Sequence, residues 1–105
     1  MLEILSMGKQ VIATDYSAHT EFLTSDNARL VAIDSLAPAM DGQLTGQWAA
    51  WGESQHDQLV SHLRDVHASR LNGMLGVNEA GIETARVFSW EASADALLRA
   101  LASQG

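Results

Sequence analysis

The sequence predicts an α/β fold in which short parallel strands are followed by three helices. Two continuous apolar runs, residues 11–14 and 30–33, are typical of parallel strands covered on both faces. Helical spacing of apolar residues begins after them, near residue 52. Because a sheet of only two strands is rarely stable alone, we expect residues 1–105 to be one partial domain, the C-terminal part of a larger α/β domain.

The first half of the chain contains the strands and their connections. Gly8 follows a short apolar segment and fits the left-handed residue that ends a helix. Polar residues separate the two strands and are typical of turns. The expected elements are, in order, a short helix, a strand, a helical turn, a polar turn, a strand and a long loop, over 2–7, 11–14, 18–23, 25–27, 30–33 and 35–51.

The second half predicts three helices. The first is amphipathic and covers about 52–70, with His67 expected to be half-buried on its apolar side. Asn78 can cap a second helix that runs to about Phe88. Ser89 can cap the last helix, with Glu91 in its first turn. The apolar stripe of this last helix comprises Trp90, Ala94, Leu97, Leu98 and Leu101, and we expect Trp90 to pack in the protein.

Composition limits the classes of partner. The formal net charge is -7, and the single lysine and five arginines are scattered. Nucleic acids and anionic membranes both need clustered cations, so neither is expected as a primary partner. The chain has no cysteine, no apolar run near the ~18 residues that span a bilayer and no signal-peptide pattern. We expect a cytoplasmic location, with the membrane periphery as the alternative for a larger parent protein.

Histidine spacing predicts no metal site. His56, His62 and His67 are separated by six and five residues, so no pair shares a helix face at the usual three- or four-residue interval. Glycine-rich phosphate loops and the common hydrolase motifs are also missing from the sequence. We therefore expect no metal and no cofactor.

Carboxylates near the start of the chain are the candidate ligand-binding groups. Glu3 can accept hydrogen bonds from two vicinal hydroxyls, although a solvated helix glutamate is the alternative. Asp15 follows the first strand, at the sheet edge where α/β proteins bind ligands. Ser17, His19 and Glu21 follow on the same loop, where ordinary turn and capping chemistry is the alternative.

Three segments resemble the C-terminal domain of the GT-B-fold retaining glycosyltransferases of "group 1" (family 4-like). They are the segment 2–15, which reads LEILSMGKQVIATD, the segment 17–22, which reads SAHTEF, and the segment 88–91, which reads FSWE. They occur in the family's order and extend over the whole chain. The resemblance implies a Rossmann-like GT-B domain that binds a nucleotide-sugar donor. Gln10 replaces the family's commoner proline, and residues 35–51 depart from most members.

The resemblance also implies roles for individual residues. Glu3 matches the second glutamate of the family's Glu-x7-Glu motif, which binds the ribose hydroxyls of the nucleotide. The first glutamate, and the basic pair that neutralises the donor diphosphate, would lie before Met1. We therefore expect no catalytic residue here, and an inactive fragment that either self-associates through its open strand edge or is only marginally stable. The alternative is a stand-alone α/β interaction module whose contact surface is the segment 35–51.

Overall fold

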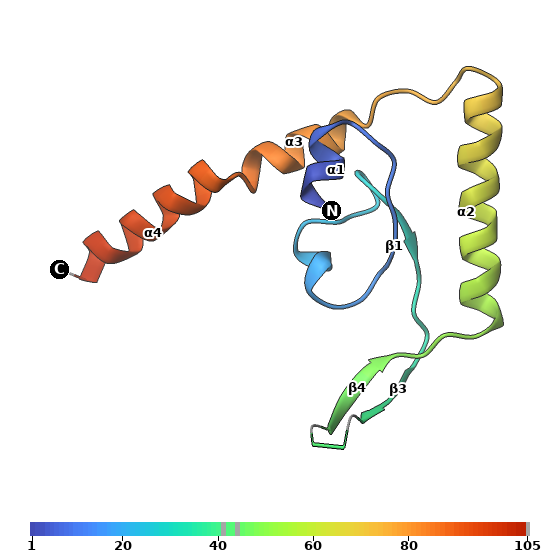
Figure 1. The fold of residues 1–105 in the computed structure, drawn as a ribbon, viewed down its shortest axis with the longest axis horizontal. Coiled ribbons are helices and arrows are strands. Elements are labelled where there is room, and N and C mark those ends of the chain that lie inside the picture. Colours follow the sequence, from blue (N-terminus) through green and yellow to red (C-terminus); the bar gives the residue numbers. More distant parts are fainter. Residues whose placement is uncertain (41, 44, 105) are drawn as a thin grey trace.

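The computed structural model describes residues 1–40, 42–43 and 45–104, which form a mixed α/β structure (Figure 1). The expected α/β class is confirmed at this level, and three helices follow the short strands. The elements in chain order are α1 (Leu2–Ser6), β1 (Ile12–Thr14), the 3₁₀ turn η1 (Ala18–Glu21), β2 (Arg29–Val31), β3 (Leu36–Met40), β4 (Thr45–Ala49), α2 (Glu53–Leu71), α3 (Glu79–Val87) and α4 (Trp90–Gln104).

Strands β1 and β2 pair in parallel, as the apolar runs predict. Ile12 lies opposite Arg29 and Thr14 opposite Val31, so the paired segment is three residues long. Around it, Leu5, Val11 and Leu23 form a small buried core. The residues of β1 itself are only half-buried, so the expectation of a strand fully covered on both faces is wrong.

Helices α1 and α3 pack together and form one wall of this core. Gly8 ends α1 with φ +70°, which confirms the expected left-handed residue. Gly81 allows the close approach of the two helices, because a Cβ atom there would come within 2.9 Å of the Leu5 side chain. Asn78 caps α3 by accepting a 3.0 Å hydrogen bond from the Gly81 N–H, as expected.

Polar side chains of helix α2 bind backbone carbonyls at and just after β2, in addition to the apolar contact expected for this helix. His62 donates to the Leu30 carbonyl at 2.9 Å, and Gln55, only 4% exposed, donates to the Ala32 carbonyl at 3.1 Å. His67 is exposed, so its expected half-buried position on the apolar side is wrong. The side of α2 that faces β2 contains His62 in place of the expected His67. The backbone carbonyls of Leu30 and Ala32 need hydrogen-bond donors, and His62 and Gln55 supply them.

The segment expected to be a long loop contains an antiparallel β-hairpin. Strands β3 and β4 pair from Leu36 opposite Ala49 to Met40 opposite Thr45. The hairpin protrudes from the body of the molecule (Figure 1). Pro38 and two glycines make the segment look like a loop, yet proline is compatible with an edge strand. The expectation of an irregular loop over 35–51 is therefore wrong.

Helix α4 extends away from the other elements (Figure 1). Ser89 caps it by accepting a 3.1 Å hydrogen bond from the Ala92 N–H, as expected. None of its described residues is buried, and Trp90 is 93% exposed. The expected packing of Trp90 is therefore wrong, and the apolar stripe of α4 has no partner helix among the described residues. No helix in the described ranges is both long and apolar enough to cross a lipid bilayer.

Candidate functional site

A cavity of about 540 Å³ opens between α1, η1 and the junction of α3 with α4. Its walls carry two carboxylates, Glu3 and Glu21, and three aromatic rings, Phe22, Phe88 and Trp90. A volume of this size lies within the range of small-molecule sites, which combine an apolar lining with a few polar groups. We take this cavity, called the α1–α4 pocket below, as the candidate ligand site.

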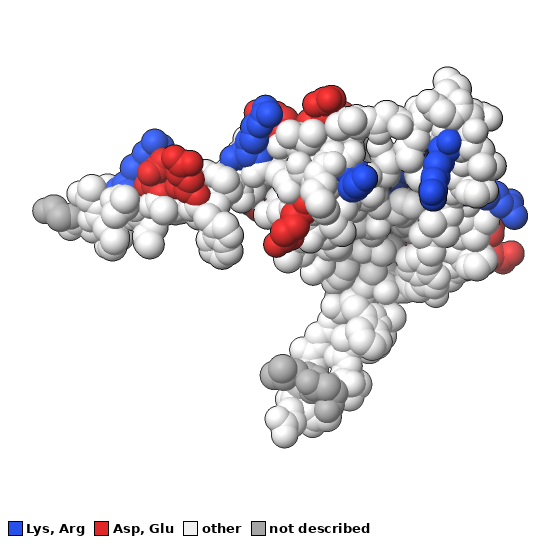
Figure 2. All heavy atoms as spheres, turned by 45° about the horizontal axis from the view of Figure 1, so that its top comes forward, with Lys and Arg blue, Asp and Glu red and all other residues white. Residues whose placement is uncertain are grey.

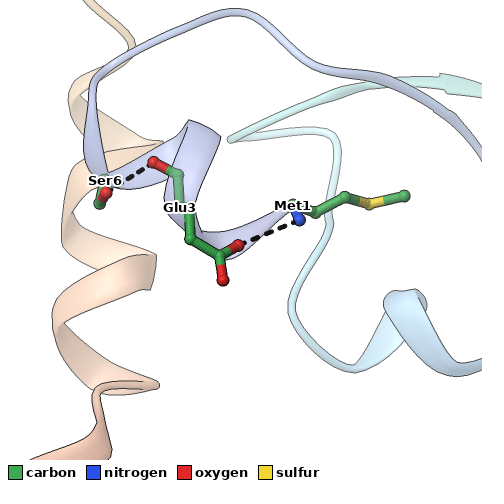
Figure 3. A network of polar contacts seen from close by, with 3 residues as sticks. All are labelled: Met1, Glu3 and Ser6. Atoms are coloured by element: carbon green, nitrogen blue, oxygen red, sulfur yellow. Dashed lines mark hydrogen bonds and ion pairs between the residues drawn. The ribbon is translucent and has the colours of Figure 1, made fainter.

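Glu3 lies on the exposed side of α1 (Figure 3). Its carboxylate is 3.4 Å from the Met1 ammonium, and its carbonyl accepts a 2.6 Å hydrogen bond from the Ser6 hydroxyl. A hydrogen bond from its own backbone N–H, followed by the hydrogen bond and charge of that ammonium, holds the pKa of Glu3 below its usual range. The carboxylate is therefore ionised, and a pure hydrogen-bond acceptor, throughout the neutral pH range.

The aromatic wall of the pocket is formed by residues far apart in the sequence. The Phe22 and Phe88 rings are 5.9 Å apart between centroids and inclined by 56°, a geometry that favours aromatic pairs. Trp90 follows at the start of α4 with its indole exposed. A planar apolar group could lie against these rings while its hydroxyl or N–H donors face the two carboxylates.

Two asparagines, one buried and one half-buried, hold the walls of the pocket in place. Asn27, 5% exposed, donates to the Phe22 carbonyl and to the Thr84 hydroxyl, both at 2.8 Å, and accepts from the Thr24 N–H at 2.9 Å. Asn78 donates to the Asn27 carbonyl at 2.8 Å. These bonds connect the segment after η1 with α3, so they fix the distance between the Phe22 and Phe88 sides of the pocket.

The structure brings two of the five candidate site residues together and leaves the other three apart. Glu3 and Glu21 both line the α1–α4 pocket. Asp15, Ser17 and His19 are not among its lining residues.

Asp15, Ser17 and His19 have local positions in the loop after β1. Asp15 is exposed, and its N–H extends the sheet by donating to the Val31 carbonyl. Ser17 adopts φ +77°, and its carbonyl accepts hydrogen bonds from the Thr20 N–H and hydroxyl. The His19 ring donates to the Thr14 carbonyl. For Ser17 and His19, this geometry matches the turn chemistry that the sequence analysis gave as the alternative.

Phe88 and Trp90 are pocket residues that the sequence did not lead us to expect in a site. Phe88 was expected only as the end of a helix, and Trp90 as a packed residue. The pocket exists because α3 packs against α1, which no local pattern encodes. The one sequence feature that pointed to a pocket was the pair of aromatic residues on either side of the α4 cap, at 88 and 90. Such a pair is equally typical of residues packed at the edge of a core.

The charges of the pocket determine which part of a ligand it can hold. Its described lining contains carboxylates but no lysine or arginine, so it offers nothing to neutralise a phosphate. Within the described ranges, no three His, Asp or Glu side chains are close enough together to hold a metal ion. The arrangement suits an uncharged group with hydroxyl donors and an apolar face.

Comparison with protein-family models, with curated proteins and with solved structures found no significant match.

Proposed function

We propose that this chain forms part of the nucleotide-sugar-binding domain of a retaining glycosyltransferase of the GT-B fold. The observation that carries the proposal is the α1–α4 pocket, in which Glu3 lies beside an aromatic wall. Glu3 is also the residue that the resemblance assigns to ribose binding. The sequence resemblance and the pocket are separate observations that lead to the same residue.

In this proposal the pocket receives the nucleoside end of the donor. Glu3 accepts hydrogen bonds from both ribose hydroxyls, because its carboxylate is ionised and faces solvent. Phe88 and Trp90 contact the apolar face of the nucleoside. The transferred sugar and the diphosphate extend beyond the pocket, where residues of a larger parent protein in the cytoplasm supply the cations and complete the transfer.

Nucleotide binding by Glu3→Ala tests this proposal. We expect the wild-type chain to bind ribonucleoside diphosphates more tightly than their 2′-deoxy forms, by about tenfold, because a lost hydroxyl leaves the carboxylate without one charge-assisted bond. In Glu3→Ala this preference for ribose should disappear. Calorimetric titration of both proteins with UDP, GDP, ADP and the 2′-deoxy forms measures the four corners of a double-mutant cycle.

Glu53→Ala is the matched control, because Glu53 is also an exposed glutamate in a first helical turn but lies on α2, outside the pocket. It should keep the full preference for ribose. Additive losses from Glu3→Ala and from deoxyribose would contradict direct contact. Loss of the ribose preference in Glu53→Ala as well would indicate that contact between Glu3 and the ribose is not the source of this preference.

The protruding hairpin favours a second candidate, the interaction module. Met40 is 73% exposed and Trp48 is 59% exposed, so the hairpin presents large apolar side chains that a partner could cover. A chain that binds no nucleotide yet associates through β3 and β4 would fit this function.

A further inference from the structure

The two outer edges of the hairpin differ in hydrogen-bonding capacity. The Ala50 N–H donates to the Ser35 carbonyl, so this pair is hydrogen-bonded and the pairs alternate from there along the hairpin. Gln47 and Pro38 therefore form a non-hydrogen-bonded pair, and their backbone groups point outward. The 3.1 Å hydrogen bond from the Tyr16 hydroxyl to the Gln47 carbonyl agrees with this orientation.

Proline removes a donor from one of these edges, whereas the other edge keeps its donors and has one carbonyl, that of Gln47, occupied by the Tyr16 hydroxyl. Pro38 has no N–H, so the outer edge of β3 lacks its central donor. The outer edge of β4 keeps the outward N–H and carbonyl groups of Thr45, Gln47 and Ala49. No charged residue lies within β4 to discourage pairing. Only the β4 edge is therefore suited to an added strand.

We propose that β4 pairs antiparallel with β4 of a second copy of this chain, around a two-fold axis at Gln47. In this register Thr45 lies opposite Ala49 of the other copy, and Gly46 lies opposite Trp48. A Cβ atom on Gly46 would meet nothing within 4 Å, so the exposed Trp48 indole of the second copy has room to cover this glycine. The interface is self-complementary, as two-fold symmetry requires.

Charge and surface area favour a second copy as the occupant. Two chains of net charge -7 repel each other, and neither β3 nor β4 contains a charged residue (Figure 2), so a contact along β4 brings no charged strand residues of the two copies together. The chain exposes 7832 Å², whereas a compact monomer of its mass exposes about 5,700 Å². The excess, about 2,100 Å², exceeds the roughly 800 Å² per partner that a standard interface buries.

Substitution by proline tests the edge directly. Gln47→Pro removes the outward donor of β4 but no hydrogen bond within the hairpin, so it copies the effect of Pro38 on the opposite strand. We expect the wild-type chain to dimerise reversibly in sedimentation velocity, and Gln47→Pro to weaken the dimer by at least about fivefold, since two bonds are lost across the axis. Leu36→Pro, with the same substitution on the outer edge of β3, is the matched control and should dimerise like the wild type.

Two further variants keep the test decisive if Gln47→Pro misfolds. Tyr16→Phe removes the hydroxyl that occupies the Gln47 carbonyl, so the dimer should become about two- to tenfold tighter. The chain has no cysteine, and Gln47→Cys should form a disulfide between copies on oxidation, because residues at the two-fold axis are about 5.5 Å apart at Cα. Leu36→Cys should not.

Three results would overturn the proposal. One is a wild-type chain that stays monomeric at every concentration, even if the hairpin binds another partner. Another is equal weakening by Leu36→Pro and Gln47→Pro. The third is a larger loss from Leu101→Glu than from Gln47→Pro, which would place the contact on the apolar stripe of α4. Nucleotide binding is measured separately, so failure here leaves the proposed function intact.

Discussion

At the scale of residues, small and polar side chains at close approaches determine the shape of the pocket. Gly8 is buried where α1 ends, and its carbonyl accepts a 2.8 Å hydrogen bond from the Asn78 N–H at the start of α3. Gly81 lets α3 approach Leu5 of the core. These contacts place the helix that carries the Phe88 side of the pocket against the helix that carries Glu3.

Gly8→Ala should therefore destabilise the fold by about 2 kcal/mol or more, because the left-handed conformation and a steric clash act together. A Cβ atom at this position would be 2.5 Å from the Val77 side chain, and φ is +70°. Urea unfolding followed by circular dichroism measures the free energy of unfolding.

Gly76→Ala is the control for Gly8→Ala. A Cβ atom at Gly76 meets nothing within 4 Å, and its φ lies outside the left-handed region. We expect a change within about 0.5 kcal/mol of zero, or a small gain in stability. Equal destabilisation by the two substitutions would contradict the packing described for α1 and α3.

At the scale of elements, features encoded by neighbouring residues were predictable from the sequence. The caps Asn78 and Ser89 and the bounds of α2 near 52–70 follow from local chemistry, and the structure has them. The hairpin was missed because Pro38 and the glycines are typical of loops, and only the outward direction of the Pro38 nitrogen makes that strand acceptable.

Ser89→Ala should weaken α4 without unfolding the core. Loss of the cap costs a helix about 1 kcal/mol. Helix α4 buries none of its described residues, so the loss should appear as reduced helical circular dichroism and not as a lower midpoint of unfolding. Ser103→Ala, near the other end of α4, is the control and should change neither the helical circular dichroism nor the midpoint of unfolding. A lowered midpoint in Ser89→Ala would mean that α4 packs on the core in solution.

At the scale of the whole molecule, the fold is extended. The radius of gyration over Cα atoms is 17.6 Å, whereas a compact domain of this length has about 13 Å. The core is small, and both the hairpin and α4 lie outside it (Figure 1). This arrangement could not be predicted from the sequence, because an apolar stripe on a helix indicates a buried face without identifying what covers it.

The composition of the candidate site could likewise be predicted only in part, because the sequence does not show which distant residues pack together. Glu3 was selected by local chemistry and by resemblance, and Glu21 by its place on the loop after a strand. Their meeting in one pocket depends on α1 and η1 packing around the same core, which includes Leu5 and Leu23. Phe88 and Trp90 complete the pocket from α3 and α4, across a separation in sequence that no local pattern spans.

Small-angle X-ray scattering tests the extended shape. The Gln47→Pro variant is the suitable sample, because a dimer would enlarge the measured radius. We expect a radius of gyration close to the 17.6 Å of the structure, since neither the hairpin nor α4 has enough apolar contact with the core to fold back onto it. A sample in concentrated urea should approach about 33 Å, the value of an unfolded chain of this length. A native value near 13 Å would show that α4 and the hairpin close over the body, and the α1–α4 pocket would then be covered by the chain itself.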